Sequence, residues 1–497
     1  MPISKANLGG MDQLVVMYQH HLQRLQRGYE AVMATRQLDA IVVGSGVAAS
    51  RNRFDDQFWP LSVTPAFAHW VPLQEPDAFV VVRPGKKPTL IRTVVDDYWH
   101  SAHAPESDHF WSEFDIIEVK PGGAKAHFPV LRCDYITRDP LGMSGGGINS
   151  PDLVAALDAL RTVKSEYEIH CLAEASRRAA RGHRAVERAF LDGDRSELTL
   201  HLTYLGASEQ DDASTPYKGI VALGPHAAVL HHSVYGTRPF GKTDTSLLID
   251  AGAKFAGYGS DITRTYARGG GAAARQFASL IAAVDGVQRK LCEVIGVGME
   301  YEALHDQSHT LLAIALEEIG LLRGKPEECV ARGVTRALFP HGLGHSLGIV
   351  THDVGCKPRA PRAENRYLRT TCAVAKDQVF TIEPGVYFIE SLLAPLRADE
   401  RKALVNWPLV DVLKPFGGVR IEDNIHVLED GVRNLTREAF APDGGKFVVS
   451  RATRREGAEP VMPVRKRSGA PTMGPDELEK GASAPAPTGD PDLDDFI

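Results

Sequence analysis

The sequence predicts an α/β (α+β) protein with two folded domains and a disordered tail, and three observations support this prediction. A chain of 497 residues is longer than a single hydrophobic core usually organises. Helix and strand signals alternate over residues 1–164, which is typical of a small α/β domain. Residues 165–450 carry short hairpins between long helices, and residues 451–497 are rich in proline.

The first domain is predicted from four segments. Met11 to Arg36 has apolar residues at intervals of three and four, which indicates a helix. Leu38 to Val43 is a short apolar run that ends at glycines, so we expect a buried strand. Ala78 to Val82 and Thr89 to Arg92 flank a Pro-Gly turn and predict two further strands.

The second domain begins with a long helix. Lys164 to Phe190 is amphipathic and rich in Ala, Glu and Arg, so we place the domain boundary near Lys164. A helix is also expected to start just before it, at Ser150–Pro151. Gln276 to Gly296 and Tyr301 to Gly320 are the clearest later helices.

The tail, residues 451–497, cannot bury enough apolar surface to offset its chain entropy, which predicts disorder. The basic run Arg465 to Arg467 within it is either a solvated patch or a contact site.

The composition argues against several classes of protein. The net charge of −7 gives no basic footprint for nucleic acid. Apolar stretches are too short to span a membrane, and the N-terminus lacks the apolar core of a signal peptide. The six cysteines form no Cys-x-x-Cys pair, which argues against a zinc knot or a disulfide framework. We therefore expect a cytoplasmic protein with reduced thiols that binds neither nucleic acid nor membranes.

Two aspartates provide the first sign of a site. The segment TSLLIDAGAKFAGYGSDITRTYA reads as two strands joined by a hairpin about Phe255 and Ala256. That fold would place Asp250 directly opposite Asp261, with Cβ atoms roughly 5 Å apart. Such carboxylates repel unless one is protonated or a cation lies between them. The simpler alternative is that each aspartate caps a turn separately.

Two glutamates follow apolar strand residues. In VFTIEPGVYF, Glu383 shares a strand face with Thr381. In GVRIEDNIHV, Glu422 shares a face with Arg420 and Asn424. A plain ion pair between Glu422 and Arg420 is the simpler alternative.

A histidine-rich segment, FPHGLGHSLGIVTHDVG, contains His341, His345 and His352. Its glycines make a regular helix costly, by about 1 kcal/mol each. We expect an extended segment whose backbone lies close to a ligand. The spacing does not separate His341 from His345 as a metal ligand.

Together, four carboxylates and a histidine at strand ends predict two divalent ions. Carboxylate-rich ligation favours manganese, magnesium or cobalt over structural zinc. Two ions about 3.5–4 Å apart can share a water, lower its pKa and stabilise a developing oxyanion. The expected chemistry is hydrolysis.

Along the chain, the aspartate segment is followed by the histidine-rich segment, then by TIEPG and RIEDN. These four motifs in this order resemble those of the pita-bread metallopeptidases, and best of all the bacterial Xaa-Pro dipeptidases (prolidases), which include the organophosphorus acid anhydrolases. The resemblance covers about residues 11–450, including Phe54 to Leu73 and the DYWH motif, Asp97 to His100. It implies a pita-bread catalytic domain at residues 165–450 and an N-terminal domain that makes dimer and pocket contacts.

The resemblance also implies a division of ligands. Asp250 would bind one metal, and His345 and Glu383 the other. Asp261 and Glu422 would bridge the pair. Glu383 would also act as general base and acid toward a hydroxide that bridges the metals.

Further residues would surround the metals. His341 would be a pocket residue, His352 would steady the substrate or the transition state, and Arg420 would line the site. His231 would bind substrate, although His232 beside it leaves the register open. The remaining implied substrate contacts are Arg369 on the proline carboxylate, Tyr217, Tyr301 and Leu368 in side pockets, and Asp56, or alternatively Asp55, from a partner subunit.

The function implied is hydrolysis of dipeptides with a C-terminal proline, in a homodimer with two ions per subunit. Manganese is the expected ion, with cobalt, magnesium and zinc as alternatives. Side hydrolysis of organophosphate triesters is also expected. The alternatives are an aminopeptidase P that acts on longer Xaa-Pro peptides and a non-catalytic pita-bread binding protein.

Overall fold

The computed structural model describes residues 5–95, 98, 108–130, 132–138, 146–441 and 448–449. The tail at residues 451–497, with its basic run Arg465 to Arg467, lies outside the described residues, as do Asp97 and His100 of the DYWH motif. The disorder expected for the tail therefore stays a prediction.

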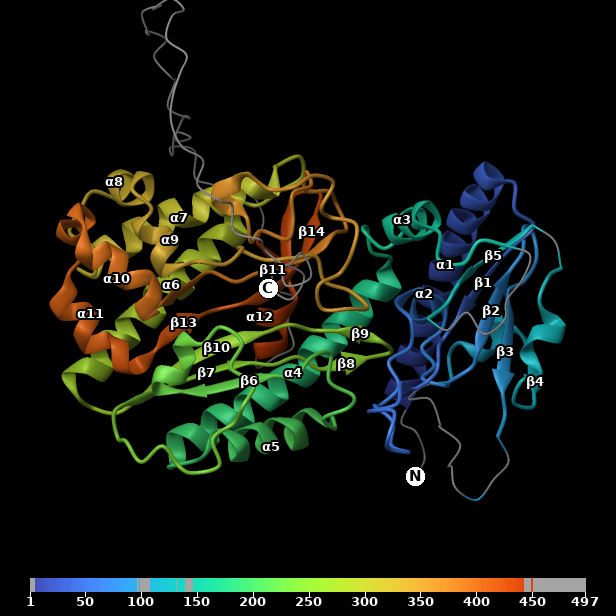
Figure 1. Cartoon of the computed structure of the whole chain (residues 1–497), viewed down its shortest axis with the longest axis horizontal. Coiled ribbons are helices and arrows are strands. Elements are labelled where there is room, and N and C mark those ends of the chain that lie inside the picture. Colours follow the sequence, from blue (N-terminus) through green and yellow to red (C-terminus); the bar gives the residue numbers. More distant parts are fainter. Residues whose placement is uncertain are drawn as a thin grey trace, which may run out of the picture. The chain divides into compact units, whose positions relative to one another are not determined.

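The N-terminal part is a five-stranded mixed sheet beside helix α1 (Lys5–Arg36), as Figure 1 shows. The strand order is β4-β3-β2-β1-β5, in which β1 runs antiparallel to β2 and parallel to β5. The strands are β1 (Ala40–Gly44), β2 (Phe79–Val82), β3 (Thr89–Thr93), β4 (Asp115–Val119) and β5 (Cys133–Ile136). The helices after α1 are α2 (Pro65–Trp70) and α3 (Pro151–Ala159), with 3-10 turns at Trp111–Glu113 and Ala124–His127. The sequence predicts α1, β1, β2 and β3 correctly, and α3 begins at the predicted proline.

The C-terminal part contains several small sheets. A three-stranded antiparallel sheet has the order β10-β7-β6, a four-stranded sheet the order β11-β14-β15-β16, and β12 pairs with β13. Its strands are β6 (Ile220–Leu223), β7 (Thr245–Asp250), β8 (Lys254–Phe255), β9 (Tyr258–Gly259), β10 (Thr263–Arg268), β11 (Val379–Ile382), β12 (Gly385–Tyr387), β13 (Gly418–Arg420), β14 (Asp423–Leu428), β15 (Gly431–Asn434) and β16 (Val448–Val449).

Helices pack around these sheets, and α4 and α5 lie along the sheet that contains β6 and β7 (Figure 1). The helices are α4 (Glu166–Asp192), α5 (Glu197–Ser208), α6 (Ala272–Val294), α7 (Tyr301–Glu318), α8 (Pro326–Ala331), α9 (Val334–Leu338), α10 (Glu390–Ala398), α11 (Trp407–Leu413) and α12 (Leu435–Phe440). The 3-10 turns are Gly224–Ala228, Ala363–Asn365, Glu400–Leu404 and Lys414–Phe416. The predicted helices at 276–296 and 301–320 correspond to α6 and α7.

The predicted pairing of the two aspartates is wrong by two residues. Asp250 pairs with Thr263, not with Asp261. The hairpin turns at Ala256 and Gly257, which both have positive φ (48° and 88°). A two-residue hairpin loop favours positive φ at both positions, and glycine adopts it easily, so the turn lies one residue later than predicted. Because the shift is even, both aspartates still face the same side.

Two strands predicted to be continuous are broken. The segment expected from Tyr258 to Tyr266 divides into β9 and β10, and the segment expected from Gly418 to Val427 divides into β13 and β14. The second break occurs because β13 pairs with β12 whereas β14 pairs with β11. Asp261 and Glu422 lie in the two breaks.

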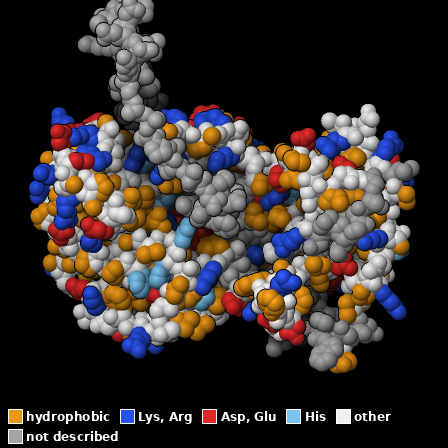
Figure 2. All heavy atoms as spheres, viewed as in Figure 1, with side chains coloured by type: hydrophobic (Ala, Val, Ile, Leu, Met, Phe, Trp, Pro, Cys, Tyr) orange, Lys and Arg blue, Asp and Glu red, His pale blue; other side chains and the backbone are white. Residues whose placement is uncertain are grey.

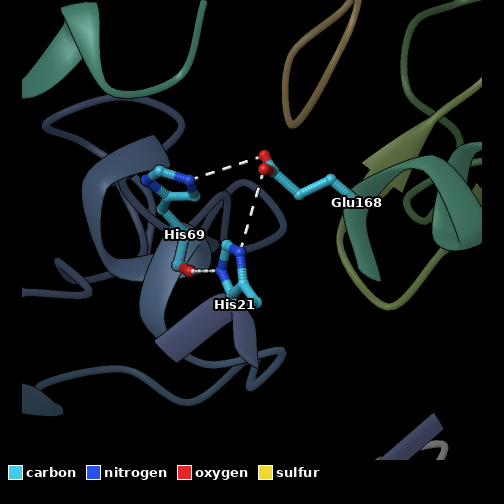
Figure 3. Close-up of side chains that lie close together, drawn as sticks. All are labelled: His21, His69 and Glu168. Atoms are coloured by element: carbon cyan, nitrogen blue, oxygen red, sulfur yellow. Dashed lines mark hydrogen bonds and ion pairs between the residues drawn. The ribbon is translucent and has the colours of Figure 1, made fainter. Parts of the chain in front are cut away.

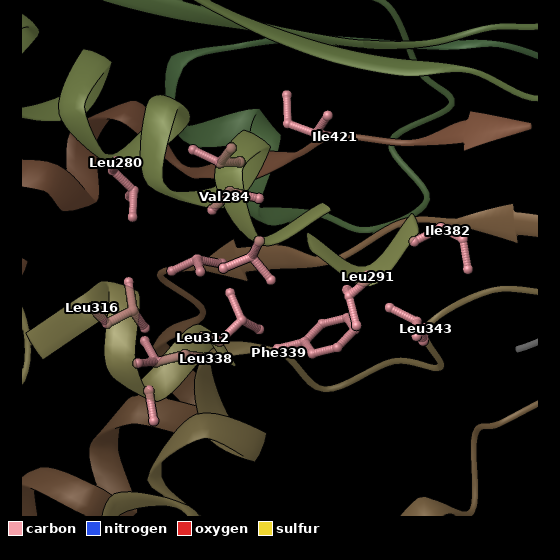
Figure 4. Packing of buried hydrophobic residues seen from close by; sticks show 14 of the residues in the cluster. Leu280, Val284, Leu291, Leu312, Leu316, Leu338, Phe339, Leu343, Ile382 and Ile421 are labelled. Carbon is pink, nitrogen blue, oxygen red and sulfur yellow. The ribbon is translucent and has the colours of Figure 1, made fainter. Parts of the chain in front are cut away.

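A large hydrophobic cluster lies directly beneath the strands that carry the glutamates. Ile382 and Ile421 belong to this cluster together with Leu291 of α6 and Leu312 of α7, and Figure 4 shows these residues. Both isoleucines are essentially buried. Because successive strand residues point to opposite sides, their neighbours Glu383 and Glu422 are directed away from the core.

A second, polar cluster joins helices α1, α2 and α4, and Figure 3 shows its three side chains, His21, His69 and Glu168. His21 bonds through Nε2 to the His69 carbonyl oxygen at 2.8 Å, and through Nδ1 to the Ser165 hydroxyl at 2.9 Å. Ser165 and Glu168 form a capping box that begins α4.

Apolar packing also crosses between the two parts of the chain. Tyr18 and Tyr29 of α1 belong to the same hydrophobic cluster as Tyr167 and Leu172 of α4. The chain from Met1 to Arg451 clusters as one unit, so the domain division near Lys164 stays a prediction.

The surface is mixed in charge. Figure 2 shows acidic, basic and apolar side chains interspersed on the face in view, without a large field of one sign. Within the described residues, no helix is long and apolar enough to cross a membrane.

Candidate metal centre

Asp250 and Asp261 meet at the hydroxyl of Tyr217. The Tyr217 oxygen lies 2.7 Å from Oδ1 of Asp250 and 2.5 Å from Oδ1 of Asp261. Arg420 donates from Nη2 to the other oxygen of Asp250 at 2.6 Å. The two carboxylates predicted from the sequence therefore do converge, although on a diagonal of the sheet rather than directly opposite each other.

The glycine-rich segment pairs with strand β11 and so aligns His345 with Glu383. The backbone N–H of Thr381 donates to the His345 carbonyl at 2.9 Å, and the N–H of Glu383 donates to the Leu343 carbonyl at 2.8 Å. A Cβ on Gly344 would lie only 2.1 Å from the Thr381 carbonyl oxygen. Only residues 343–347 of the segment run alongside β11, whereas residues 348–352 form bends, so the predicted extended conformation holds for part of the segment. Position 344 requires glycine because the two backbones touch.

The ring of His345 is oriented for ligation. Its Nδ1 lies 3.0 Å from the Ser346 carbonyl oxygen, which can only accept, so Nδ1 carries the hydrogen. Its Nε2 faces two carboxylates, 3.4 Å from Asp261 Oδ2 and 3.6 Å from Glu383 Oε1. A hydrogen bond from the second ring nitrogen is the usual means of fixing the tautomer of a metal-binding histidine.

His341 is turned to other partners. Its Nδ1 lies 2.8 Å from the Gly342 carbonyl, so Nε2 accepts from the Tyr387 hydroxyl at 2.8 Å. The lone pair of Nε2 is therefore already used. This geometry separates the two histidines that the spacing left equal.

Glu422 completes the group from the opposite strand. The Thr263 hydroxyl donates to Glu422 Oε2 at 2.6 Å, and the Glu422 backbone N–H donates to the Thr263 carbonyl at 3.1 Å. One ligand atom each from Asp261, His345 and Glu422 lies within 4.8 Å of the others, and all three side chains are buried.

Burial disfavours the ionised form of three of the carboxyl groups. Burial raises the pKa of Asp250, raises that of Glu383 to about 7, and raises that of Glu422 well above its ordinary value. Burial lowers the pKa of His345, but its bond to Asp261 and the charge of Glu383 outweigh this effect and raise it.

The donor set fits divalent cations. Buried carboxylates with raised pKa values are stabilised when positive charge lies between them. Four carboxylates and one imidazole suit hard or borderline ions such as manganese. Asp261, His345 and Glu422 form one of three candidate metal-binding groups among the described residues, and Asp250 and Glu383 are the neighbouring carboxylates with raised pKa values.

His352 and His231 lie beside this centre. The ring of His352 meets that of His345 edge-on at 4.5 Å. Burial, His345 and Arg369 lower the pKa of His352 to about 3. His231 remains exposed, but partial burial of its ring lowers its pKa, and the charge of Arg420 lowers it further.

The two histidines of the pair have different surroundings. His232 bonds to Glu197 at 2.9 Å. The charged groups that act on His231 include Asp250, Arg420 and Arg369. These surroundings favour His231 over His232 as the substrate histidine.

The other implied pocket residues lie in different environments. Arg369 is half-buried and acts electrostatically on His231 and His352. Tyr301 is fully buried and donates to the Thr381 carbonyl at 2.9 Å, so it supports β11 from beneath. Leu368 is buried and helps line a small cavity next to His341.

Asp56 is not part of the centre within one chain. It is exposed, and its carboxylate accepts from the Gln57 amide at 3.1 Å. Asp55 is also exposed and accepts from the Gln57 backbone N–H.

Two functional contacts were missed from the sequence. Tyr387 joins His341 to Arg420, whose Nη1 donates to the Tyr387 hydroxyl at 2.9 Å. Glu197 holds the segment next to His231. Tyr387 could have been found because it lies on the same strand face as Glu383 by the period of two. Glu197 had no such signal, because it begins a helix far away in the chain.

Comparison with known proteins agrees with this geometry. Residues 170–429 match Metallopeptidase family M24, and residues 16–157 match the family described as Xaa-Pro dipeptidase, N-terminal domain. The chain belongs to metallopeptidase family M24, and it is a metal-dependent hydrolase.

Curated relatives identify the branch of the family. The chain is 40% identical over 422 residues to the Xaa-Pro dipeptidase of Marinobacter nauticus, which covers 84% of this chain and 97% of the relative. It is 39% identical over 438 residues to the Xaa-Pro dipeptidase of Xanthomonas euvesicatoria pv. vesicatoria, covering 86% and 98%.

Solved structures confirm the fold class. Pseudomonas aeruginosa aminopeptidase PepP has a TM-score of 0.65 at 21% identity, covering 85% of this chain and 95% of that chain. Zinc-substituted E. coli aminopeptidase P in complex with product has a TM-score of 0.60 at 20% identity, covering 84% and 95%. The predicted pita-bread fold is therefore confirmed, with an α/β domain before it.

Proposed function

We propose that this chain is an Xaa-Pro dipeptidase that hydrolyses dipeptides with a C-terminal proline. The observation that carries the proposal is the convergence of Asp261, His345 and Glu422 in a chain whose relatives at 36–40% identity are named Xaa-Pro dipeptidase. Two divalent ions per subunit, manganese in the first place, are part of the proposal.

The five ligands would hold the ions as the family resemblance implies, with Asp261 and Glu422 shared between them. When bound, two such ions lower the pKa of a shared water and polarise the scissile carbonyl. Glu383 would accept a proton from the attacking water and return it to the leaving nitrogen, as the family resemblance implies.

Other side chains would select and orient the substrate. His231 and His352 lie beside the centre with lowered pKa values, so both are neutral near pH 7 and can exchange hydrogen bonds with a peptide. Arg369 provides a cation on the same side of the centre. A fixed guanidinium on the proline carboxylate would favour a dipeptide, because a longer chain has no carboxylate at that position.

The test compares Ala-Pro with Ala-Pro-Ala after metal removal and separate addition of manganese, cobalt or zinc. A dipeptidase cleaves Ala-Pro and leaves the tripeptide largely intact, and its activity returns with metal. Faster cleavage of the tripeptide would instead identify an aminopeptidase P.

We further propose a cytoplasmic homodimer in which Asp56 enters the pocket of the partner subunit. Phe54, Phe58 and Trp59 next to it are exposed, with Phe54 89% accessible in the single chain. Large exposed apolar side chains in one segment suit an interface. The six cysteines are all free, which suits a reducing compartment. Light scattering tests the dimer, and an Asp56→Ala variant with unchanged activity would contradict the role of that residue.

A further inference from the structure

Glu197, the first residue of α5, is a buried carboxylate that no step above uses. Its side chain is 3% exposed, and it lies at the start of a helix that packs on β6 (Figure 1). Its carboxylate binds residues of the connection between β6 and β7.

Four donors converge on this carboxylate. Oε1 accepts from the backbone N–H of Leu223 at 2.9 Å and from Nδ1 of His226 at 2.6 Å. Oε2 accepts from Nε2 of His232 at 2.9 Å and from the backbone N–H of Gly236 at 2.7 Å. A carboxylate has about four lone-pair positions, so these donors satisfy it completely.

Direct hydrogen bonds hold this cluster together. Both histidine nitrogens lie within hydrogen-bond distance of the Glu197 oxygens. Burial raises the pKa of Glu197, but the bonds from Gly236, Leu223, His232 and His226 outweigh it and lower the pKa. The carboxylate is therefore ionised and accepts all four bonds.

The segment it holds carries His231. Residues 229–236 form no regular helix or strand, and Glu197 bonds to His232 and Gly236 on either side of the exposed Ser233 and Val234. The rings of His226 and His232 stack at 4.5 Å, which fixes their mutual orientation. His231 is the residue next to His232 on the same backbone, and the charges of Arg420 and Asp250 act on it.

We propose that Glu197 is a positioning residue that aims His231 at the substrate by latching the segment from Leu223 to Gly236. The inference rests on the proposed function of His231 in peptide hydrolysis. Because Glu197 contacts none of the five metal ligands, it acts on substrate and not on metal content.

Glu197→Gln tests the latch with little change in size. The amide nitrogen of glutamine can accept no hydrogen bond, so the backbone N–H on that side, of Leu223 or Gly236, loses its partner. The histidine on the same side keeps a bond only if it changes tautomer. We expect kcat/KM for Ala-Pro to fall about 10- to 100-fold, as for a substrate-binding group moved by a fraction of an ångström to one ångström. Metal content is expected to stay unchanged.

A double-mutant cycle with His231→Ala separates positioning from general damage. If Glu197 acts through His231, adding Glu197→Gln to the His231→Ala variant lowers kcat/KM by less than about 2-fold. The proposal would be overturned if the kcat/KM losses of the two single variants multiply in the double variant. It would also be overturned if the Glu197→Gln enzyme is as active as the wild type. Glu168→Gln is the matched control, because Glu168 is also a buried glutamate in the first turn of a helix but bonds to no residue of the site.

Two further measurements keep the result decisive. Hydrogen exchange at residues 223–236 should rise in Glu197→Gln and not in Glu168→Gln, and unchanged exchange would overturn the latch even if the wild type cleaves no Xaa-Pro dipeptide. An inactive wild type alone would overturn the proposed function and not the latch. If Glu197→Gln fails to fold, His232→Ala removes a single donor to Glu197. The same fall in kcat/KM and the same rise in hydrogen exchange are then expected, each smaller than in Glu197→Gln.

Discussion

The Nε2 atom of His345 lies 3.4 Å from Oδ2 of Asp261, although the two residues come from separate segments and neither belongs to a regular strand. Two hydrogen bonds hold the histidine side of this pair. Nδ1 of His345 is fixed by the Ser346 carbonyl, and its backbone N–H donates to the Thr381 hydroxyl at 3.0 Å. The ligand geometry therefore depends on close backbone packing as much as on the ligands.

Gly344→Ala should disrupt this packing. An added Cβ would lie 2.1 Å from the Thr381 carbonyl oxygen and 2.5 Å from the Tyr301 hydroxyl, so the segment that bears His345 must move. We expect a loss of stability of about 1–3 kcal/mol or more and weaker metal binding. Denaturant unfolding and metal titration would measure both.

Gly286→Ala is the control for that change. Gly286 lies within α6 and an added Cβ would meet nothing within 4 Å. The same substitution should therefore stabilise the protein by about 0.5–1 kcal/mol. Equal effects of the two substitutions would contradict the packing argument.

Tyr387→Phe should reduce catalysis without removing metal. The lost hydroxyl joins His341 at 2.8 Å to Arg420 at 2.9 Å, and both would lose a buried partner. One buried hydrogen bond of this kind corresponds to about 1–3 kcal/mol, which is roughly a tenfold to hundredfold fall in kcat/KM. Steady-state kinetics with metal analysis tests this, and a variant that loses its metal would place Tyr387 in the ligand shell instead.

The stability of the fold should decrease in mild acid because of His21. Burial lowers the pKa of His21 from 6.5 to about 4, so the ring is neutral in the folded protein at pH 5 while the unfolded chain binds a proton. Stability from this residue is complete above pH 6.5 and is lost as the pH falls toward 4, up to about 3 kcal/mol. The bonds of Glu168 keep its pKa low despite burial, so it acts in the same direction.

Urea unfolding of chelator-treated protein at pH 7, 5.5 and 4.5 would measure this dependence. His21→Gln removes one titrating ring and should make the curve less steep between pH 6.5 and 4, while the buried His183 and His305, whose pKa values burial also lowers to about 4, keep part of the slope. A variant with the same slope as the wild type would show that His21 does not cause it.

Much of the centre could be predicted from the sequence because strand periodicity places side chains on faces. Asp250 and Asp261 stayed on one side although the predicted register was wrong by two residues, because an even shift preserves the face of the strand. Glu383 follows a buried strand whose alternation was readable, and Ile382 lies in the core as that alternation requires.

The rest depended on contacts between distant segments. His341 and His345 have equivalent spacing, and only the carbonyl that each Nδ1 meets and the partner of each Nε2 distinguish them. Glu197 is 35 residues from His232 in the chain, and local sequence carries no signal for such a bond. The break before Glu422 arises from a change of strand partner, which the period of two cannot show.

The central claim is that five buried side chains hold two divalent ions for hydrolysis before proline. The most direct measurement is the metal content of wild type and Asp261→Asn after equilibration with manganese, together with activity on Ala-Pro. We expect two ions per chain and activity in the wild type. Because Asp261 is proposed to be shared by both ions, the variant should lose metal and at least about 100-fold in activity, the upper range found when even an outer partner of a ligand is removed. An Asp261→Asn protein that keeps both ions and full activity would contradict the account.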